Sequence, residues 1–182
     1  MKLQDFLKAQ CSCEKARKWA KKLSPEAYLR CHRGDWLLLL HGKLYPDFSK
    51  NPNQVRKRVL VAGLTVNLVR DKMTDERSIA AVDAAIAFGN GEIGIDSLNK
   101  AANAAYAVTN FVYTVNSTKA DNAAINAAYA AVYATYAANA VNYAAYVTYP
   151  NAVDYAAYAA AIYAKSADIF RDHIRFEEMI VL

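Results

Sequence analysis

The residues that could bind a metal or act as a nucleophile gather near the start of the chain: Cys11, Cys13, Cys31, His32 and His41. Zinc prefers such thiolates and imidazoles, but structural zinc sites use ligand pairs separated by about two to four residues, and no pair here has that form. Nucleophilic catalysis by cysteine and histidine needs a further residue that orients the imidazole, and the sequence indicates none. We therefore expect no metal, no cofactor and no enzymatic activity, and we expect Cys31 to pack as a small apolar side chain.

Two short motifs have contexts that do not favour their usual functions. The tripeptide Arg33-Gly34-Asp35 is a cell-adhesion signal in other settings, but here an apolar run, residues 36–40, follows it directly. We expect instead a glycine-mediated helix end near Gly34, with Asp35 capping the next turn. The stretch 91–94 lacks the glycine spacing and the preceding strand of a phosphate-binding loop, so nucleotide binding is not expected.

The basic triplet Arg56, Lys57 and Arg58 is the most distinctive charged feature. It falls in the N-terminal part of an expected helix, where cations oppose the helix dipole. One interpretation is a solvated face whose long side chains cover apolar surface, and the other is a contact surface for a partner. Residues 1–100 carry 18 Lys and Arg against 11 Asp and Glu, whereas residues 101–182 carry 4 against 6. An acidic partner would therefore meet the first half.

Apolar periodicity and capping residues predict helices along the whole chain. Ser24-Pro25 and Asn51-Pro52 read as helix starts, Thr74 as an N-cap, and Gly89-Asn90-Gly91 as a helix end. Asp168 with Arg171, and Asp172 with Arg175, are spaced for charge pairs that solvate the last turns. The expected helices span residues 13–23, 24–34, 51–69, 74–91, 97–116, 120–149 and 151–180, and the apolar run 36–40 is expected to form a buried helical turn between helices.

Residues 101–164 are composed mainly of Ala, Tyr and Asn, with 25 Ala, 11 Tyr and 8 Asn among 64 positions. Asn and Tyr recur there at steps of three and four, a pattern typical of helices packed at shallow angles. The stripes either cover alanines of neighbouring helices or form a face for a partner, because tyrosine is enriched at interfaces. The candidate contact residues are Arg56, Lys57 and Arg58 or the tyrosines Tyr129, Tyr133 and Tyr136.

These patterns predict an all-α, single-domain bundle of about six to seven helices. Basic helices in residues 1–95 would carry an Ala/Tyr-rich antiparallel half, residues 96–182, that packs on them. The start of the chain shows no hydrophobic signal core, and the three cysteines are an odd number, so we expect free thiols and a cytoplasmic location without a membrane partner.

Several segments together resemble a family of immunity proteins from bacterial polymorphic-toxin systems, whose members are alanine-rich and helical. They are Cys13-Glu14 with Ala16 and Trp19, Pro25-Glu26, residues 31–37, and Ala167-Asp168-Ile169 with Arg171. The resemblance implies a small cytoplasmic protein that binds and neutralises a cognate toxin without catalysis.

Three functions follow from these observations. The first is a non-catalytic protein-binding module, an immunity protein or stoichiometric inhibitor of a toxin or enzyme; a phage-encoded inhibitor of a bacterial defence enzyme is its variant. The second is nucleic-acid binding through Lys15, Lys18, Lys22 and the basic triplet, although these cations are not interleaved with the tyrosines. The third is a structural role through self-association, which makes a homo-oligomer possible.

Overall fold

The computed structural model describes residues 14–73, 75–114 and 155–180. Within these ranges the chain forms seven α-helices, two short 3-10 helices and no strand, which confirms the all-α class. The α-helices are α2 (Glu14–Ala20), α3 (Pro25–Leu29), α4 (Gly34–Leu44), α5 (Pro52–Asn67), α6 (Glu76–Asn90), α7 (Ile95–Thr114) and α10 (Tyr155–His173). The 3-10 helices are η1 (Arg70–Lys72) and η2 (Phe176–Met179).

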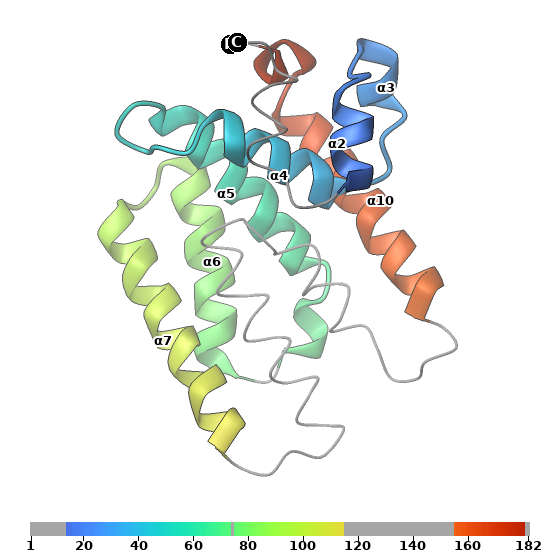
Figure 1. Ribbon diagram of the computed structural model, residues 1–182. Helices are drawn as coiled ribbons and strands as arrows, with labels where there is room; N and C mark the ends of the chain where they lie inside the picture. The colour runs from blue at the N-terminus through green and yellow to red at the C-terminus, as the bar shows by residue number, and fades with distance from the viewer. Residues whose placement is uncertain (1–13, 74, 115–154, 181–182) are drawn as a thin grey trace.

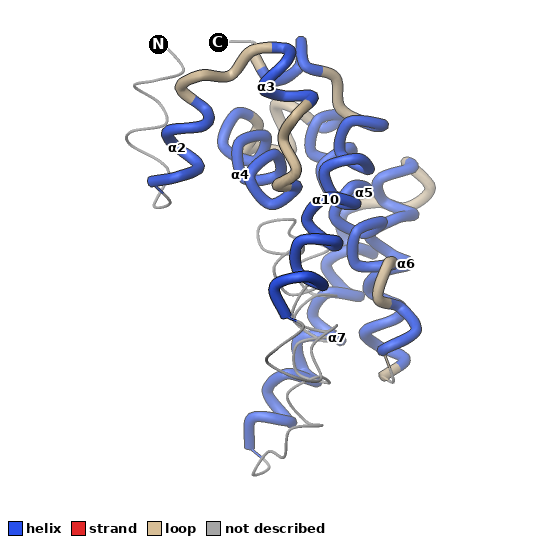
Figure 2. The backbone as a smooth tube through the Cα atoms, turned by 90° about the vertical axis from the view of Figure 1, so that its right-hand side faces the viewer, coloured by secondary structure: helices blue, strands red, loops and turns tan. Residues whose placement is uncertain are grey.

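Helix α5 lies at the centre of the arrangement. It packs against α4, α6 and α10, and α7 packs on the far side of α6 (Figure 1). Helix α10 also packs against α4, and the short helices α2 and α3 form the corner beside them (Figure 2). The last described helix therefore lies on helices from the first third of the chain.

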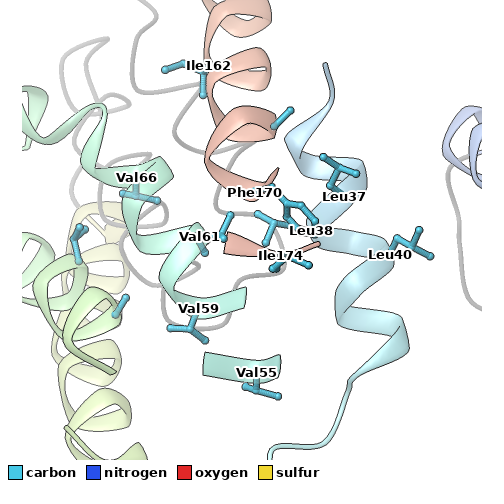
Figure 3. Close-up of a cluster of buried hydrophobic side chains, with 14 of the residues drawn as sticks. Leu37, Leu38, Leu40, Val55, Val59, Val61, Val66, Ile162, Phe170 and Ile174 are labelled. Atoms are coloured by element: carbon cyan, nitrogen blue, oxygen red, sulfur yellow. The ribbon is translucent and has the colours of Figure 1, made fainter. Parts of the chain in front are cut away.

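The core joins α4, α5 and α10. Figure 3 shows Leu37 and Leu38 of α4 beside Phe170 of α10 and Ile174, which directly follows α10, with Val61 of α5 facing them. All five side chains are buried, and three of the largest, Phe170, Leu37 and Ile174, have no exposed surface. Truncation of a buried phenylalanine to alanine typically costs about 3 to 5 kcal/mol, so this packing is the main force that holds α10 in place.

Local capping signals explain the start of α3 and both ends of α6. Ser24 caps α3 through its hydroxyl, which accepts a hydrogen bond from the Ala27 amide at 3.2 Å, and Pro25 follows as the first helical residue. Gly91 ends α6 with φ +84°, a left-handed conformation that favours glycine. The N-cap of α6 is Asp75, whose carboxylate accepts from the Arg77 and Ser78 amides. The prediction of Thr74 as this cap is thus wrong by one residue, because the aspartate supplies the stronger acceptor.

The prediction of a helix end near Gly34 is wrong. Helix α3 already ends at Leu29, and Gly34 is the first residue of α4, which includes the apolar run predicted to be a buried helical turn. A Cβ atom at position 34 would lie 2.5 Å from Cβ and 2.7 Å from the backbone carbon of Ser166 in α10. Gly34 is therefore required by a close approach of two helices. The N-cap of α4 is Arg33, and the Asp35 carboxylate pairs with the Arg33 guanidinium.

The C-terminal helix also differs from its prediction. Helix α10 ends at His173 instead of continuing to residue 180, and η2 follows after a turn. Tyr28 donates a hydrogen bond to the Ile174 carbonyl at that turn. The predicted pair of Asp168 and Arg171 forms, but the Arg171 side chain is only 15% exposed and also donates to the Cys31 carbonyl at 2.7 Å. Arg171 thus binds α10 to the segment after α3 and does not simply solvate the helix.

Several predictions concern residues outside the described ranges. These are the helix at residues 120–149, the start of the helix at 151–180, the tyrosines Tyr129, Tyr133 and Tyr136, and the cysteines Cys11 and Cys13.

Candidate functional site

The basic triplet lies in the first turns of α5, and each of its side chains has a partner within the protein. The Arg56 guanidinium donates hydrogen bonds to the carbonyl oxygens of Phe88 and Ile93, and it lies 4.4 Å from the centre of the Phe88 ring. Arg56 thereby connects the start of α5 to the end of α6 and to the following loop. The carbonyls at a helix C-terminus favour a cation, which explains why an arginine is stable here.

Lys57 forms an ion pair with Glu178 of η2, with Nζ and Oε1 2.6 Å apart. The same Oε1 accepts from the Gln54 side-chain amide at 2.8 Å, and Oε2 accepts from the Arg175 backbone amide at 2.9 Å. Burial opposes ionisation of Glu178, but these hydrogen bonds and the nearby ammonium outweigh it and lower the pKa of the carboxyl to about 2. Glu178 is therefore a carboxylate at neutral pH and the charged centre of the contact between α5 and η2.

His41 of α4 lies beneath this contact and has no exposed surface. Its Nε2 lies 3.0 Å from the Gln54 side-chain oxygen. Because the Gln54 amide nitrogen donates to Glu178, its oxygen must accept, so His41 carries its proton on Nε2. His41 Nδ1 is then a buried acceptor without a hydrogen-bond partner. Burial lowers the pKa of His41 to about 4; Arg58 and Lys57 act in the same direction, while Gln54 and Glu178 oppose them.

Arg58 and Tyr45 complete the group. Arg58 donates to the Tyr45 carbonyl at 2.7 Å at the end of α4, and burial lowers the pKa of the guanidinium. The Tyr45 hydroxyl donates to the Glu178 backbone carbonyl at 2.7 Å. The six residues of this group are His41, Tyr45, Gln54, Lys57, Arg58 and Glu178.

The intramolecular contacts of the triplet predict that it contributes to stability. We expect Arg56→Ala to lower the free energy of unfolding by about 1 to 3 kcal/mol, because it leaves two carbonyls without their charged donor and removes a cation–π contact. Urea denaturation measures this loss. Lys100→Ala, at an exposed position of α7, is the control and is expected to change stability by no more than about 0.5 kcal/mol. Equal stability of the two variants would contradict the assignment.

The segment Arg33-Gly34-Asp35-Trp36 connects α4 to α10. The Arg33 guanidinium lies over the rings of Trp36 and Tyr163, at 4.7 Å and 4.5 Å from their centres, and it pairs with the Asp35 carboxylate. Gly34 meets Ser166 in the next turn of α10. The Ser166 hydroxyl lies 3.1 Å from that of Thr65 in α5, so all three core helices meet at this point. The motif therefore has a packing role in this fold.

Cys31 is 5% exposed and belongs to the core, as predicted. Burial raises the pKa of its thiol, so the reactive thiolate is disfavoured. Among the described residues no group of three His, Cys, Asp or Glu side chains could hold a metal ion.

Two of the three lysines considered for nucleic-acid binding, Lys15 and Lys22, are exposed and form no ion pair with a carboxylate of the described residues. Lys18 instead pairs with Glu14 at 2.8 Å. Since the triplet has intramolecular partners as well, the cations considered for nucleic-acid binding do not form one open surface over the described residues. Such a surface is what phosphate binding requires.

The Asn and Tyr stripe on α7 lies on the surface. Asn99, Asn103 and Tyr106 are exposed, and the Tyr106 side chain is 48% exposed. The opposite face of α7 is buried, with Leu98 and Ala105 in the core. Helix α6 therefore holds the described part of the stripe outward; we call these three residues the α7 stripe.

Gln54 and Glu178 were not predicted as members of a site, and His41 was weighed only as a metal ligand or as the partner of a catalytic cysteine. His41 follows the apolar run of α4 and shares its buried face, a position that predicts a core side chain. Glu178 lies between the partly buried Phe176 and the buried Met179. The side chains that bind its carboxylate, Lys57 and Gln54, are far along the chain, so no local signal could have found them.

No helix in the described part of the chain has the length and apolar character needed to cross a membrane. Comparison of the chain with protein-family models, with curated proteins and with solved structures gives no match.

Proposed function

We propose that the protein is a non-catalytic protein-binding module, an immunity protein or stoichiometric inhibitor that neutralises a toxin or a defence enzyme in the cytoplasm. The observation that supports this proposal is the exposed α7 stripe, Asn99, Asn103 and Tyr106, on a helix whose other face is buried. Tyrosine offers a large rigid contact area with a polar tip, and asparagine offers both donors and acceptors. A helix already fixed by α6 also loses little conformational entropy when a partner binds.

The intramolecular role of the basic triplet favours protein binding over nucleic-acid binding. Arg56, Lys57 and Arg58 each have a partner within the protein, whereas the α7 stripe is an exposed surface with interface-type composition among the described residues. The α7 stripe carries no charge, so contacts with the phosphate backbone of a nucleic acid would contribute little binding free energy.

Site-specific photo-crosslinking in living cells tests the proposal. A photoreactive amino acid at position 103 is expected to give one discrete adduct that contains a second protein and keeps its mobility after nuclease treatment. The same amino acid at position 50, where Lys50 is 78% exposed in the loop between α4 and α5, is the control and is expected to give none. Adducts that are absent at 103, equal at both positions, or sensitive to nuclease would contradict the proposal.

A further inference from the structure

The last described segment, residues 174–180, folds back onto α4 and α5 after α10 has ended; we call it the tail. It includes η2, the last turn of the ribbon in Figure 1, which contacts α4. Met179 has no exposed surface, whereas Glu177 and Ile180 on either side of the Glu178–Met179 pair are exposed. Ile174 is buried where the tail leaves α10, and Phe176 is partly buried against the core. Near its end, the tail inserts Met179 as an anchor between residues that are exposed to solvent.

Charged and polar groups of α4 and α5 bind the residue next to this anchor. The Glu178 carboxylate accepts from Lys57 at 2.6 Å and from Gln54 at 2.8 Å, and its carbonyl accepts from the Tyr45 hydroxyl at 2.7 Å. Hydrogen bonds to an ionised group are about twice as strong as neutral ones. The tail is therefore held by buried apolar side chains and by Glu178, whose carboxylate accepts from two side chains of α5 and whose carbonyl accepts from Tyr45.

This arrangement has the form of a docked peptide. Peptide recognition typically combines a few buried anchors with a small number of oriented polar contacts, while the remaining peptide stays exposed. The tail has no helical continuity with α10, since the chain leaves the helix at His173 and η2 starts at Phe176. A glutamate of another chain can accept the same hydrogen bonds that Glu178 receives.

The surface beneath the tail is more polar than stability alone would favour. His41 is fully buried, and its Nδ1 has no hydrogen-bond partner. An unsatisfied buried polar atom costs about 1 to 3 kcal/mol, and such atoms in native proteins call for an explanation. The ordered relay from His41 through Gln54 to the carboxylate provides one, because it fixes the Gln54 amide in the orientation that donates to an incoming glutamate.

We propose that His41, Tyr45, Gln54 and Lys57 form a peptide-recognition site that the tail occupies in this structure and that a partner segment can occupy in its place. The partner segment has the chemistry of the tail, a glutamate followed directly by a large flexible apolar residue. This site lies on α4 and α5, so the inference is independent of the α7 stripe.

The tail competes strongly because it is covalently attached. A short tether gives an effective concentration of about millimolar, so a free peptide at micromolar concentration does not displace the intact tail. Weakening the anchor of the tail, while leaving the recognition site intact, is expected to open the site to a peptide added in solution.

Fluorescence anisotropy with a labelled peptide of residues 173–182 measures this exchange on the full-length chain. We expect Met179→Ala to bind the peptide at least about tenfold more tightly than the unchanged chain does. Adding Lys57→Ala to that variant, or replacing Glu178 by Lys in the peptide, is expected to abolish the gain. Met73→Ala is the matched control, because Met73 is also a buried methionine but lies beyond the far end of α5; it is expected to give no gain.

The proposal is overturned if folded Met179→Ala binds the peptide no better than the unchanged chain, or if Met73→Ala gains as much. Should Met179→Ala fail to fold, Glu178→Gln replaces it, with the same expected gain and the same contradicting result. Native-state hydrogen exchange on the unchanged chain gives a second test. The amides of residues 177–180 are expected to exchange through a local opening whose free energy is lower than that of the opening that exposes the amides of α10. If both sets of amides exchanged only through global unfolding, this result would contradict the proposal.

Discussion

Replacing Gly34 by alanine is expected to lower the free energy of unfolding by about 3 kcal/mol, because the new methyl group has no room between α4 and α10. It would lie 2.5 Å from Ser166 Cβ and 2.7 Å from the Ser166 backbone carbon. Relief requires that α10 move away, which also loosens the packing of Phe170 and Ile174. Chemical denaturation followed by circular dichroism measures the loss.

Gly42→Ala is the matched control in the same helix. A Cβ atom at position 42 meets its nearest neighbour, Arg58 Cδ, at 3.6 Å, which is an ordinary contact. Alanine in a helix interior is favoured over glycine by about 0.5 to 1 kcal/mol, so this variant is expected to be as stable as the unchanged protein or slightly more stable. If the two variants had equal stability, the close contact between α4 and α10 would be wrong.

Acidification is expected to destabilise the protein in two successive ranges, and the first is due to His41. Its pKa is about 4 in the folded protein and 6.5 in the unfolded chain. The unfolded chain therefore binds a proton on this group at a pH where the folded protein does not. Stability is fully present above pH 6.5 and falls as the pH drops towards 4, by about 3 kcal/mol in all.

Glu178 adds a second loss at lower pH. Its pKa is about 2 in the folded protein against 4.5 for the free carboxyl, so its contribution is present above pH 4.5 and is lost as the pH falls towards 2. The side chain is 20% exposed, and we expect this loss to be about 2 to 3 kcal/mol. Both ranges have the same sign because each group loses stabilisation when the medium becomes acidic.

Free energies of unfolding measured at a series of pH values test the two assignments separately. His41→Leu is expected to flatten the profile between pH 6.5 and 4 and to leave the lower range unchanged, whereas Glu178→Gln is expected to do the reverse. A His41→Leu profile as steep as that of the unchanged protein in the upper range would contradict the buried neutral imidazole.

The parts of the fold that local chemistry determines could be predicted from the sequence. Ser24 with Pro25 starts α3, Gly91 ends α6, and the apolar run of α4 is helical and buried, because each depends on residues a few positions apart. The α7 stripe was predicted as a pattern, but only the packing of Leu98 and Ala105 shows that its described part faces outward.

Features that depend on distant residues could not be predicted. A glycine shortly before an apolar run is typical of a helix end. Glycine is required at position 34 because any larger side chain would collide with Ser166, which belongs to a helix near the other end of the chain. The basic triplet looked like a surface feature because its partners, Phe88, Tyr45 and Glu178, are contributed by three other elements. A role of the triplet in binding a partner stays a prediction.

The most direct test uses the partner protein that crosslinking at position 103 identifies. Titration calorimetry measures the affinity of that partner for two arginine variants of the present chain. Asn103→Arg is expected to weaken binding at least about thirtyfold, or about 2 kcal/mol, without changing the melting temperature. Asn90→Arg, at another exposed asparagine, is expected to bind with one-to-one stoichiometry and unchanged affinity. Unchanged affinity of Asn103→Arg would contradict the claim that the α7 stripe is the partner-binding surface.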